Sequence, residues 1–200
     1  MLGATLGIAE YLDRFCQELR QVDLAQVENL ADLIERAYQD GRFVFVIGNG
    51  GSGANASHLC EDLNKCTLRD FENQKRLRVL SLTDNTAGIM AWANDEGYDR
   101  IFVEQLKTYG SPGDLLLAIS GSGNSPNVLK AVDWANANGI DTVGITGYSG
   151  GRLKAQARHS LHVPLDDMGA VESIHLVVFH WLIGEMYRRI STPEAARVAV

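Results

Sequence analysis

Two loops rich in glycine, serine and asparagine are the segments whose composition points most directly to a ligand site. One reads GNGGSG over residues 48–53 and the other reads SGSGNS over residues 120–125, and each lies between an apolar run and a helical pattern. Glycine lets the backbone approach a ligand closely, and a helix that begins there offers unpaired N–H groups at the positive end of its dipole. The second loop adds three hydroxyls without lysine or arginine, which suits a phosphate monoester.

The first loop carries no nucleotide-binding motif. The first lacks the third glycine of GxGxxG, and no GK[ST] follows it, so it is not a Walker loop. Taken alone, the first loop is also compatible with a tight strand-to-helix turn, and a serine–glycine turn is weak evidence. Two such loops at the carboxyl edge of one sheet indicate a shared anion site much more strongly.

A second set of residues could carry acid–base and metal-binding chemistry. His58 and Asp62 are four residues apart in the helical pattern after the first loop, so they share one helix face. A histidine and a carboxylate at this spacing form a plausible half of a zinc site. Near the C-terminus, Glu172, His175 and His180 are polar residues of a long apolar helical pattern and need partners if buried. Histidine nitrogens and carboxylate oxygens are ligands that suit zinc or another divalent ion.

The spacing in that last helix limits how these ligands can meet. Glu172 and His180 are eight residues apart, which is about 12 Å along a continuous helix. One metal seldom spans that distance from one straight helix. Either Glu172 lies before the helix starts, or the ligands come from different subunits. His175, three residues after Glu172, is the rival ligand and an alternative orienting partner.

The elements that position these residues alternate between strand and helix. Short runs rich in Val, Ile and Leu predict strands near residues 42–48, 77–84, 114–123, 141–147 and 160–165. Helical spacing lies between them, near 52–66, 86–94, 99–109, 126–138, 151–157 and 170–190. This alternation predicts an α/β fold: a doubly wound, open parallel sheet of about five strands with helices on both faces. Ligands of such folds bind at the carboxyl ends of the strands.

The chain reads as one domain over residues 1–200, with an α/β core over 41–190. Residues 1–40 form an N-terminal helical segment of two apolar-striped helices, with Asp23 placed to cap the second and Gly41 to end it. Both helices are long and precede the first predicted strand. We therefore expect their apolar faces to contact a neighbouring subunit as well as the core of their own chain. The tail from Ser191, broken by Pro193, is expected to fray.

Composition excludes several classes of function. The 200 residues carry a net charge of −7, which disfavours sequence-independent nucleic-acid binding because that requires basic surface. No apolar run approaches the roughly 18–20 residues of a membrane helix, and the N-terminus has no basic signal-peptide region. The three cysteines lack a CxxC pair, so no disulfide framework is apparent. We expect a cytoplasmic protein without nucleic-acid or membrane partners.

Together, the motifs resemble those of a known family. GNGGS after the first strand and ISGSGNSPNV after a later one, with ANDEGYDRIF at 93–102 and ITGYSGG at 145–151, are similar to the sugar isomerase (SIS) domain family. Within it, the chain resembles the sedoheptulose 7-phosphate isomerases, also called phosphoheptose isomerases. The resemblance covers nearly the whole chain. It implies a flavodoxin-like sheet, a homotetramer with active sites between subunits, and a bound zinc.

The resemblance also implies roles for individual residues. Asp62 and His180 would be the catalytic pair, and one zinc or other divalent ion per site would be held by His58, Asp62, Glu172 and His180. The substrate contacts would be Asn49, Gly50, Gly51, Ser52, Asp95, Ser120, Gly121, Ser122, Asn124, Ser125 and Glu172. The chain departs from the family twice: Asp62 stands where the family has a glutamate, and Glu172 where it usually has a glutamine.

The function implied is an aldose–ketose isomerisation. Sedoheptulose 7-phosphate would be converted through an enediol to D-glycero-D-manno-heptose 7-phosphate, for the synthesis of bacterial surface heptose. One alternative is a non-catalytic SIS module that senses a sugar phosphate or binds a protein such as the replication initiator. Another is an isomerase for a different phosphosugar, which would account for the altered carboxylates. The retained acid–base and metal set favours an enzyme.

Overall fold

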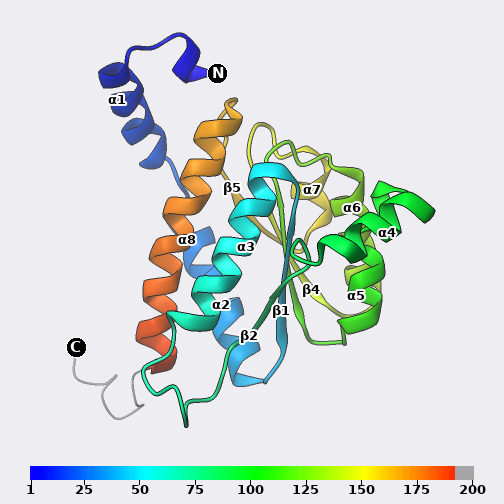
Figure 1. Ribbon diagram of the computed structural model, residues 1–200. Coiled ribbons are helices and arrows are strands. Elements are labelled where there is room, and N and C mark those ends of the chain that lie inside the picture. The colour runs from blue at the N-terminus through cyan, green and yellow to red at the C-terminus, as the bar shows by residue number, and fades with distance from the viewer. Residues whose placement is uncertain (192–200) are drawn as a thin grey trace.

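Five parallel strands form one sheet in the computed structural model, which describes residues 1–191 (Figure 1). The strand order is β2-β1-β3-β4-β5. The bounds are β1 Phe43–Gly48, β2 Arg78–Ser81, β3 Leu115–Ser120, β4 Asp141–Thr146 and β5 His159–His162. The order reverses between β1 and β3, so their carboxyl ends flank the switch point at which such sheets bind ligands. The predicted doubly wound sheet is confirmed, while the predicted fraying beyond Ser191 lies outside the described residues.

Helices cover both faces of this sheet. One face packs against α2 Leu24–Gln39, α3 Gly50–Lys65 and α8 Met168–Ser191. The other packs against α5 Val103–Tyr109, α6 Pro126–Ala137 and α7 Gly151–Gln156. Along β1 the side chains alternate between the two cores, with Val44 and Val46 in one and Phe45 and Ile47 in the other. Burial on both faces explains why the strands read as nearly continuous apolar runs.

Local signals set both ends of α2, and two other predicted helices differ from the structure. Asp23 caps α2 by accepting the N–H groups of Ala25 and Gln26, and Gly41, with φ +67°, follows its end. The helix predicted from residue 52 starts earlier, at Gly50, so the glycine loop itself forms the first turn of α3. The predicted 99–109 helix is divided into a 3-10 turn, η2 Tyr98–Arg100, and α5. Before η2, α4 spans Thr86–Asp95.

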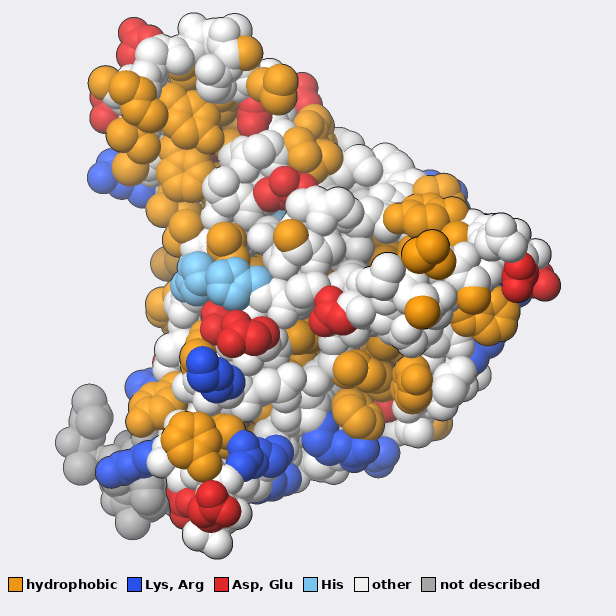
Figure 2. Space-filling model, in the orientation of Figure 1, with side chains coloured by type: hydrophobic (Ala, Val, Ile, Leu, Met, Phe, Trp, Pro, Cys, Tyr) orange, Lys and Arg blue, Asp and Glu red, His pale blue; other side chains and the backbone are white. Residues whose placement is uncertain are grey.

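The N-terminal helix projects away from the sheet. After the turn η1 Leu2–Ala4, α1 spans Ile8–Leu19 and lies beyond the body of the molecule near the start of α8 (Figure 1). Ile8 is 74% exposed and Leu12 is 53% exposed, and Figure 2 shows apolar side chains gathered over this region. Among residues 1–191, none of the helices combines the length and apolar character needed to cross a bilayer.

Candidate functional site

A pocket of about 250 Å³ lies where the two predicted loops face each other. We call it the switch-point pocket, because it opens at the carboxyl ends of β1 and β3. Helix α8 supplies its remaining wall. The pocket is lined by Asn49, Gly50, Gly51, Ser52, Ile119, Ser120, Gly121, Ser122, Ser125, Met168 and Glu172. Nine predicted substrate contacts therefore line one cavity, all of them except Asp95 and Asn124.

The SGSGNS loop is held in shape by its own hydrogen bonds. The N–H of Gly123, a residue with φ +66°, donates to the carbonyl of Ser120 over 2.9 Å. The hydroxyls of Ser120 and Ser125 are 3.1 Å apart, and Ser125 is the N-cap of α6. Asn124 braces the loop: its amide donates to the Ser122 carbonyl, and its Oδ1 accepts the N–H of Arg152. The loop therefore presents serine hydroxyls beside a helix N-terminus, as an anion site requires.

Across the pocket, the side chain of Glu172 reaches the first turn of α3. Its carboxylate accepts the N–H of Ser52, and burial raises its pKa against that hydrogen bond. The carboxylate lies directly over Gly51, where any Cβ would collide with it. The backbone carbonyl of Glu172 also accepts the amide of Asn55, over 2.9 Å. Helices α3 and α8 are thus joined at the pocket.

Asn49 connects the two loops. Its Nδ2 donates to Oδ1 of Asn127 over 2.9 Å, and Nδ2 of Asn127 donates back to Oδ1 of Asn49 over 2.9 Å. The hydroxyl of Tyr98 donates to the same Asn49 oxygen, over 3.0 Å. The predicted substrate contact is therefore also a structural link, and sequence reasoning missed its two partners. The one available signal was a polar residue, Asn127, on the buried face of an apolar helix.

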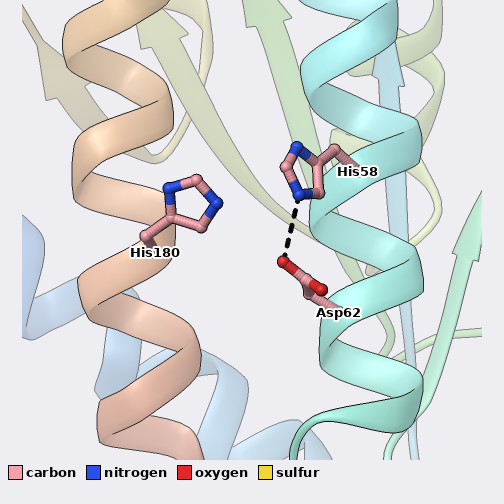
Figure 3. A group of neighbouring side chains, drawn as sticks. All are labelled: His58, Asp62 and His180. Atoms are coloured by element: carbon pink, nitrogen blue, oxygen red, sulfur yellow. Dashed lines mark ion pairs between the residues drawn. The ribbon is translucent and has the colours of Figure 1, made fainter.

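A second group of side chains lies farther along the same pair of helices. His58 and Asp62 on α3 face His180 on α8, as Figure 3 shows, and their ligand atoms all lie within 4.8 Å of one another. Nε2 of His58 is 3.2 Å from Oδ2 of Asp62, and the two histidine rings are 5.1 Å apart in an edge arrangement. The histidines exposed on this face lie together over α3 and α8, beside acidic side chains (Figure 2).

This group is partly exposed to solvent and combines imidazole and carboxylate side chains. The side chain of His58 is 43% exposed and that of Asp62 is 17% exposed. The other oxygen of Asp62 accepts a weak hydrogen bond from the thiol of Cys66, over 3.5 Å. Two imidazoles and one carboxylate at this separation offer the nitrogen and oxygen ligands that zinc and similar divalent ions take.

Helices α3 and α8 run in the same direction between the two groups. Ser52 adjoins Glu172 at the pocket, and His58 adjoins His180 farther along. The metal-capable group found within residues 1–191 does not include Glu172. One explanation offered for a shared metal, that Glu172 precedes the helix, is wrong: α8 already starts at Met168. Because the helix is continuous, the about 12 Å rise between Glu172 and His180 stands.

Two other candidates lie elsewhere. Asp95, at the exposed end of α4, accepts the amide of Asn94 over 2.7 Å and is not among the residues that line the pocket. His175 is fully buried, and its Nε2 donates to the carbonyl of Thr146 over 3.2 Å. Within the described residues its Nδ1 has no partner. Burial lowers the pKa of His175 to about 4.

Comparisons with known proteins agree with this architecture. A model of the SIS domain family matches residues 9–147. A phosphoheptose isomerase of Fusobacterium nucleatum is 36% identical over 185 residues, covering 92% of this chain and 92% of that protein. A probable phosphoheptose isomerase of Thermoplasma acidophilum is 35% identical, covering 86% and 93%. The solved phosphoheptose isomerase of Francisella tularensis superposes with a TM-score of 0.84 at 28% identity, covering 90% of this chain and 96% of that one.

Proposed function

This chain belongs to the SIS domain family and, within it, to the phosphoheptose isomerases, and from that membership we propose that it interconverts sedoheptulose 7-phosphate and D-glycero-D-manno-heptose 7-phosphate. The reaction moves a proton between two adjacent carbons through an enediol. Its product would supply the synthesis of bacterial surface heptose.

One observation carries the proposal: an acid–base group lies on α3 and α8, two helices that also line the switch-point pocket of about 250 Å³. An aldose–ketose isomerase needs a base for the carbon-bound proton and an acid for the oxygens. In our proposal, Asp62 takes the proton from carbon and His180 exchanges protons with the sugar oxygens. A module that only senses a sugar phosphate would need the pocket but not this pair.

The phosphate binds at the SGSGNS loop in this proposal. Ser120, Ser122 and Ser125 donate hydroxyl hydrogen bonds to it, and the N-terminus of α6 adds its dipole. Support comes from the pocket lining, which includes all three serines, and from Ser125, which is the N-cap of α6. Neutral donors suit a substrate that must also leave.

His58, Asp62 and His180 fit a divalent metal, because their ligand atoms converge within 4.8 Å. We propose that they hold zinc or a similar ion, which when bound would polarise the sugar carbonyl. The prediction that Glu172 is a further ligand stays a prediction, since its carboxylate is engaged at Ser52. Asp62, one methylene shorter than the family's glutamate, comes within reach of His58 because both lie on one face of α3.

We further propose that residues 1–200 act as one cytoplasmic SIS domain that assembles into a homotetramer with sites at subunit interfaces. The support is apolar surface left open by a single chain. A groove of about 330 Å³ runs between the end of α1, α2 and α8, lined mainly by Leu19, Val22, Leu24, Val27, Val177 and Trp181. Asp95, away from the pocket of its own chain, would contact the substrate of a neighbouring subunit.

Turnover of sedoheptulose 7-phosphate by the purified protein, with and without added zinc, tests the function. We expect Asp62→Asn and His180→Ala each to reduce kcat by about 100-fold or more, because each removes a proton-transfer group. His159→Ala is the matched control, since His159 lies on β5 beside Asn29 and Asp141, outside the site. A folded protein that binds the sugar phosphate without converting it would contradict the isomerase and favour a sensing module.

A further inference from the structure

Tyr98 has no role in the proposed proton transfer, yet its hydroxyl donates to Oδ1 of Asn49, a predicted substrate contact, over 3.0 Å. Tyr98 is not among the residues that line the switch-point pocket. It lines a neighbouring cavity of about 300 Å³, and Asn49 and Gly50 line both cavities. Tyr98 therefore reaches Asn49 from the neighbouring cavity and not from within the switch-point pocket.

The backbone of α6 fixes which way the amide of Asn49 is turned. The N–H of Val128 donates to Oδ1 of Asn127 over 2.9 Å, and a backbone N–H can only donate. The same Asn127 oxygen accepts Nδ2 of Asn49, and Nδ2 of Asn127 donates to Oδ1 of Asn49. A turned Asn49 amide would place nitrogen against nitrogen and oxygen against oxygen, so the orientation seen is the one that α6 permits.

The hydrogen bonds of Asn49 leave it with one free polar hydrogen. Its carbonyl oxygen has two lone pairs, which accept Asn127 and Tyr98. Its Nδ2 carries two hydrogens, one of which goes to Asn127. Within residues 1–191 no partner takes the second hydrogen, so the side chain of Asn49 can only donate to a ligand in the switch-point pocket.

A charged pair holds the turn that carries Tyr98. Asp99 follows Tyr98 in η2, and its carboxylate pairs with the ammonium of Lys130 on α6. Lys130 comes three residues after Asn127, so the two side chains lie on one face of this helix. Helix α6 thus binds Asn49 directly and also holds the turn that brings Tyr98 to it.

We propose that Tyr98 is a positioning residue of the switch-point pocket: its hydroxyl clamps the oxygen of Asn49 and so keeps the remaining N–H of that amide in place for the substrate. The inference rests on the proposed function, which puts the substrate in this pocket. An amide paired along one edge can still tilt, and a second contact on its oxygen fixes its plane. Tyr98 is 56% exposed, so water can replace this hydrogen bond and its contribution to folding stability is small.

The hydroxyl of Tyr98 can be removed without its ring by Tyr98→Phe. For this variant, Asn49→Ala and the double variant, KM, kcat and the calorimetric dissociation constant are measured with sedoheptulose 7-phosphate. Tyr109→Phe is the matched control, because it removes a hydroxyl from a tyrosine that is 49% exposed at the end of α5.

We expect Tyr98→Phe to raise KM and the dissociation constant about fivefold and to change kcat by less than about twofold, because a binding contact is misplaced and no proton-transfer group is lost. Its urea midpoint should equal that of the wild type. In the Asn49→Ala background the hydroxyl has nothing to position, so adding Tyr98→Phe should have no further effect.

Additive effects in the double variant would overturn the proposal, because Tyr98 would then act on the substrate without Asn49. A wild-type dissociation constant in Tyr98→Phe would also overturn it, and so would a weakening that Tyr109→Phe shares or that follows a lowered urea midpoint.

The role of Tyr98 and the proposed function can fail separately. If the protein converts sedoheptulose 7-phosphate and Tyr98→Phe keeps the wild-type KM, the isomerase stands and the role of Tyr98 is overturned. If no conversion occurs but Tyr98→Phe weakens binding only where Asn49 is present, the role of Tyr98 stands and the isomerase fails. Binding and turnover are measured on the same preparation.

Discussion

The side-chain amides of Asn49 and Asn127 bind each other in both directions, and this pair decides how the two loops face each other. Asn127 is 2% exposed, so its amide depends on protein partners for both hydrogen bonds. Asn49 gains a third bond from Tyr98. The pair joins the first turn of α6 to the N-cap of α3, and both helices begin at the switch-point pocket.

Removing this pair should loosen the site more than the fold. We expect Asn127→Ala to raise KM several-fold with a smaller effect on kcat, and to reduce the free energy of unfolding by about 1 kcal/mol, because the half-buried amide of Asn49 loses its partner. Steady-state kinetics and urea unfolding measure the two effects. Asn138→Ala, at the exposed end of the same helix, should change neither KM nor kcat. Equal loss in both variants would show that the pair does not position the loops.

His175 gives the protein a defined acid sensitivity. Burial penalises the charged ring and lowers its pKa from the ordinary value of 6.5 to about 4 in the folded protein. Above pH 6.5 the ring is neutral in both states, so stability is unaffected. Between pH 6.5 and 4 the unfolded chain takes up a proton that the folded chain does not, which removes up to about 3 kcal/mol of stability.

His175→Gln tests this directly. Glutamine keeps a donor for the Thr146 carbonyl but does not titrate, so the variant should lose less stability than the wild type between pH 6.5 and 4. Urea unfolding at half-unit pH steps measures the difference between the two curves, in which the contributions of the carboxylates cancel. Parallel curves would contradict the assignment of the acid sensitivity to His175.

At the level of elements, the site depends on how closely the start of α3 approaches α8. Gly51 leaves room for the carboxylate of Glu172. We expect Gly51→Ala to displace that carboxylate and to lower the free energy of unfolding by about 0.5–2 kcal/mol, the cost of a lost helix cap. In the double variant with Glu172→Ala the two losses of unfolding free energy should not add, because both substitutions remove the same interaction.

Gly184→Ala is the control for this measurement. Gly184 lies within α8 with nothing inside 4 Å of its added Cβ among the described residues. It should stabilise the protein by about 0.5–1 kcal/mol through helix propensity alone. Strictly additive losses for Gly51→Ala and Glu172→Ala would show that the carboxylate does not lie against the first turn of α3.

The same elements show what sequence reasoning could reach. Apolar runs and glycine-rich ends predicted the α/β sheet, and a spacing of four residues put His58 and Asp62 on one helix face, because these signals are local. The amide pair of Asn49 and Asn127 joins residues 78 positions apart, and no local pattern encodes it. The position of Glu172 relative to α8 was left open although a local signal was present: Asp167 caps the helix by accepting the N–H of Ala170 over 3.0 Å, so α8 starts at Met168.

At the scale of the whole molecule, the apolar surface of α1 predicts assembly. Replacing Leu12, which is 53% exposed, with glutamate puts a charge where a second copy would pack. We expect Leu12→Glu to lower the molar mass measured by light scattering and to leave the helical circular dichroism unchanged. Gln17→Glu adds the same charge at another exposed position of α1 and should preserve the assembly. A wild-type mass of one chain would contradict the proposed oligomer.

The parallel run of α3 and α8 has a consequence for substrate size. Glu172 lines the switch-point pocket at one end of this run, and His180 lies eight residues, about 12 Å, farther along α8. Packed helices do not slide freely, so the distance between the pocket and His180 is fixed by the fold. With the phosphate at the SGSGNS loop, as proposed above, we expect a triose phosphate to be too short to bring its carbonyl to His180, whereas a longer chain extends toward it. The proposed site would then select substrates by the number of carbons between phosphate and carbonyl, before any contact with an individual hydroxyl.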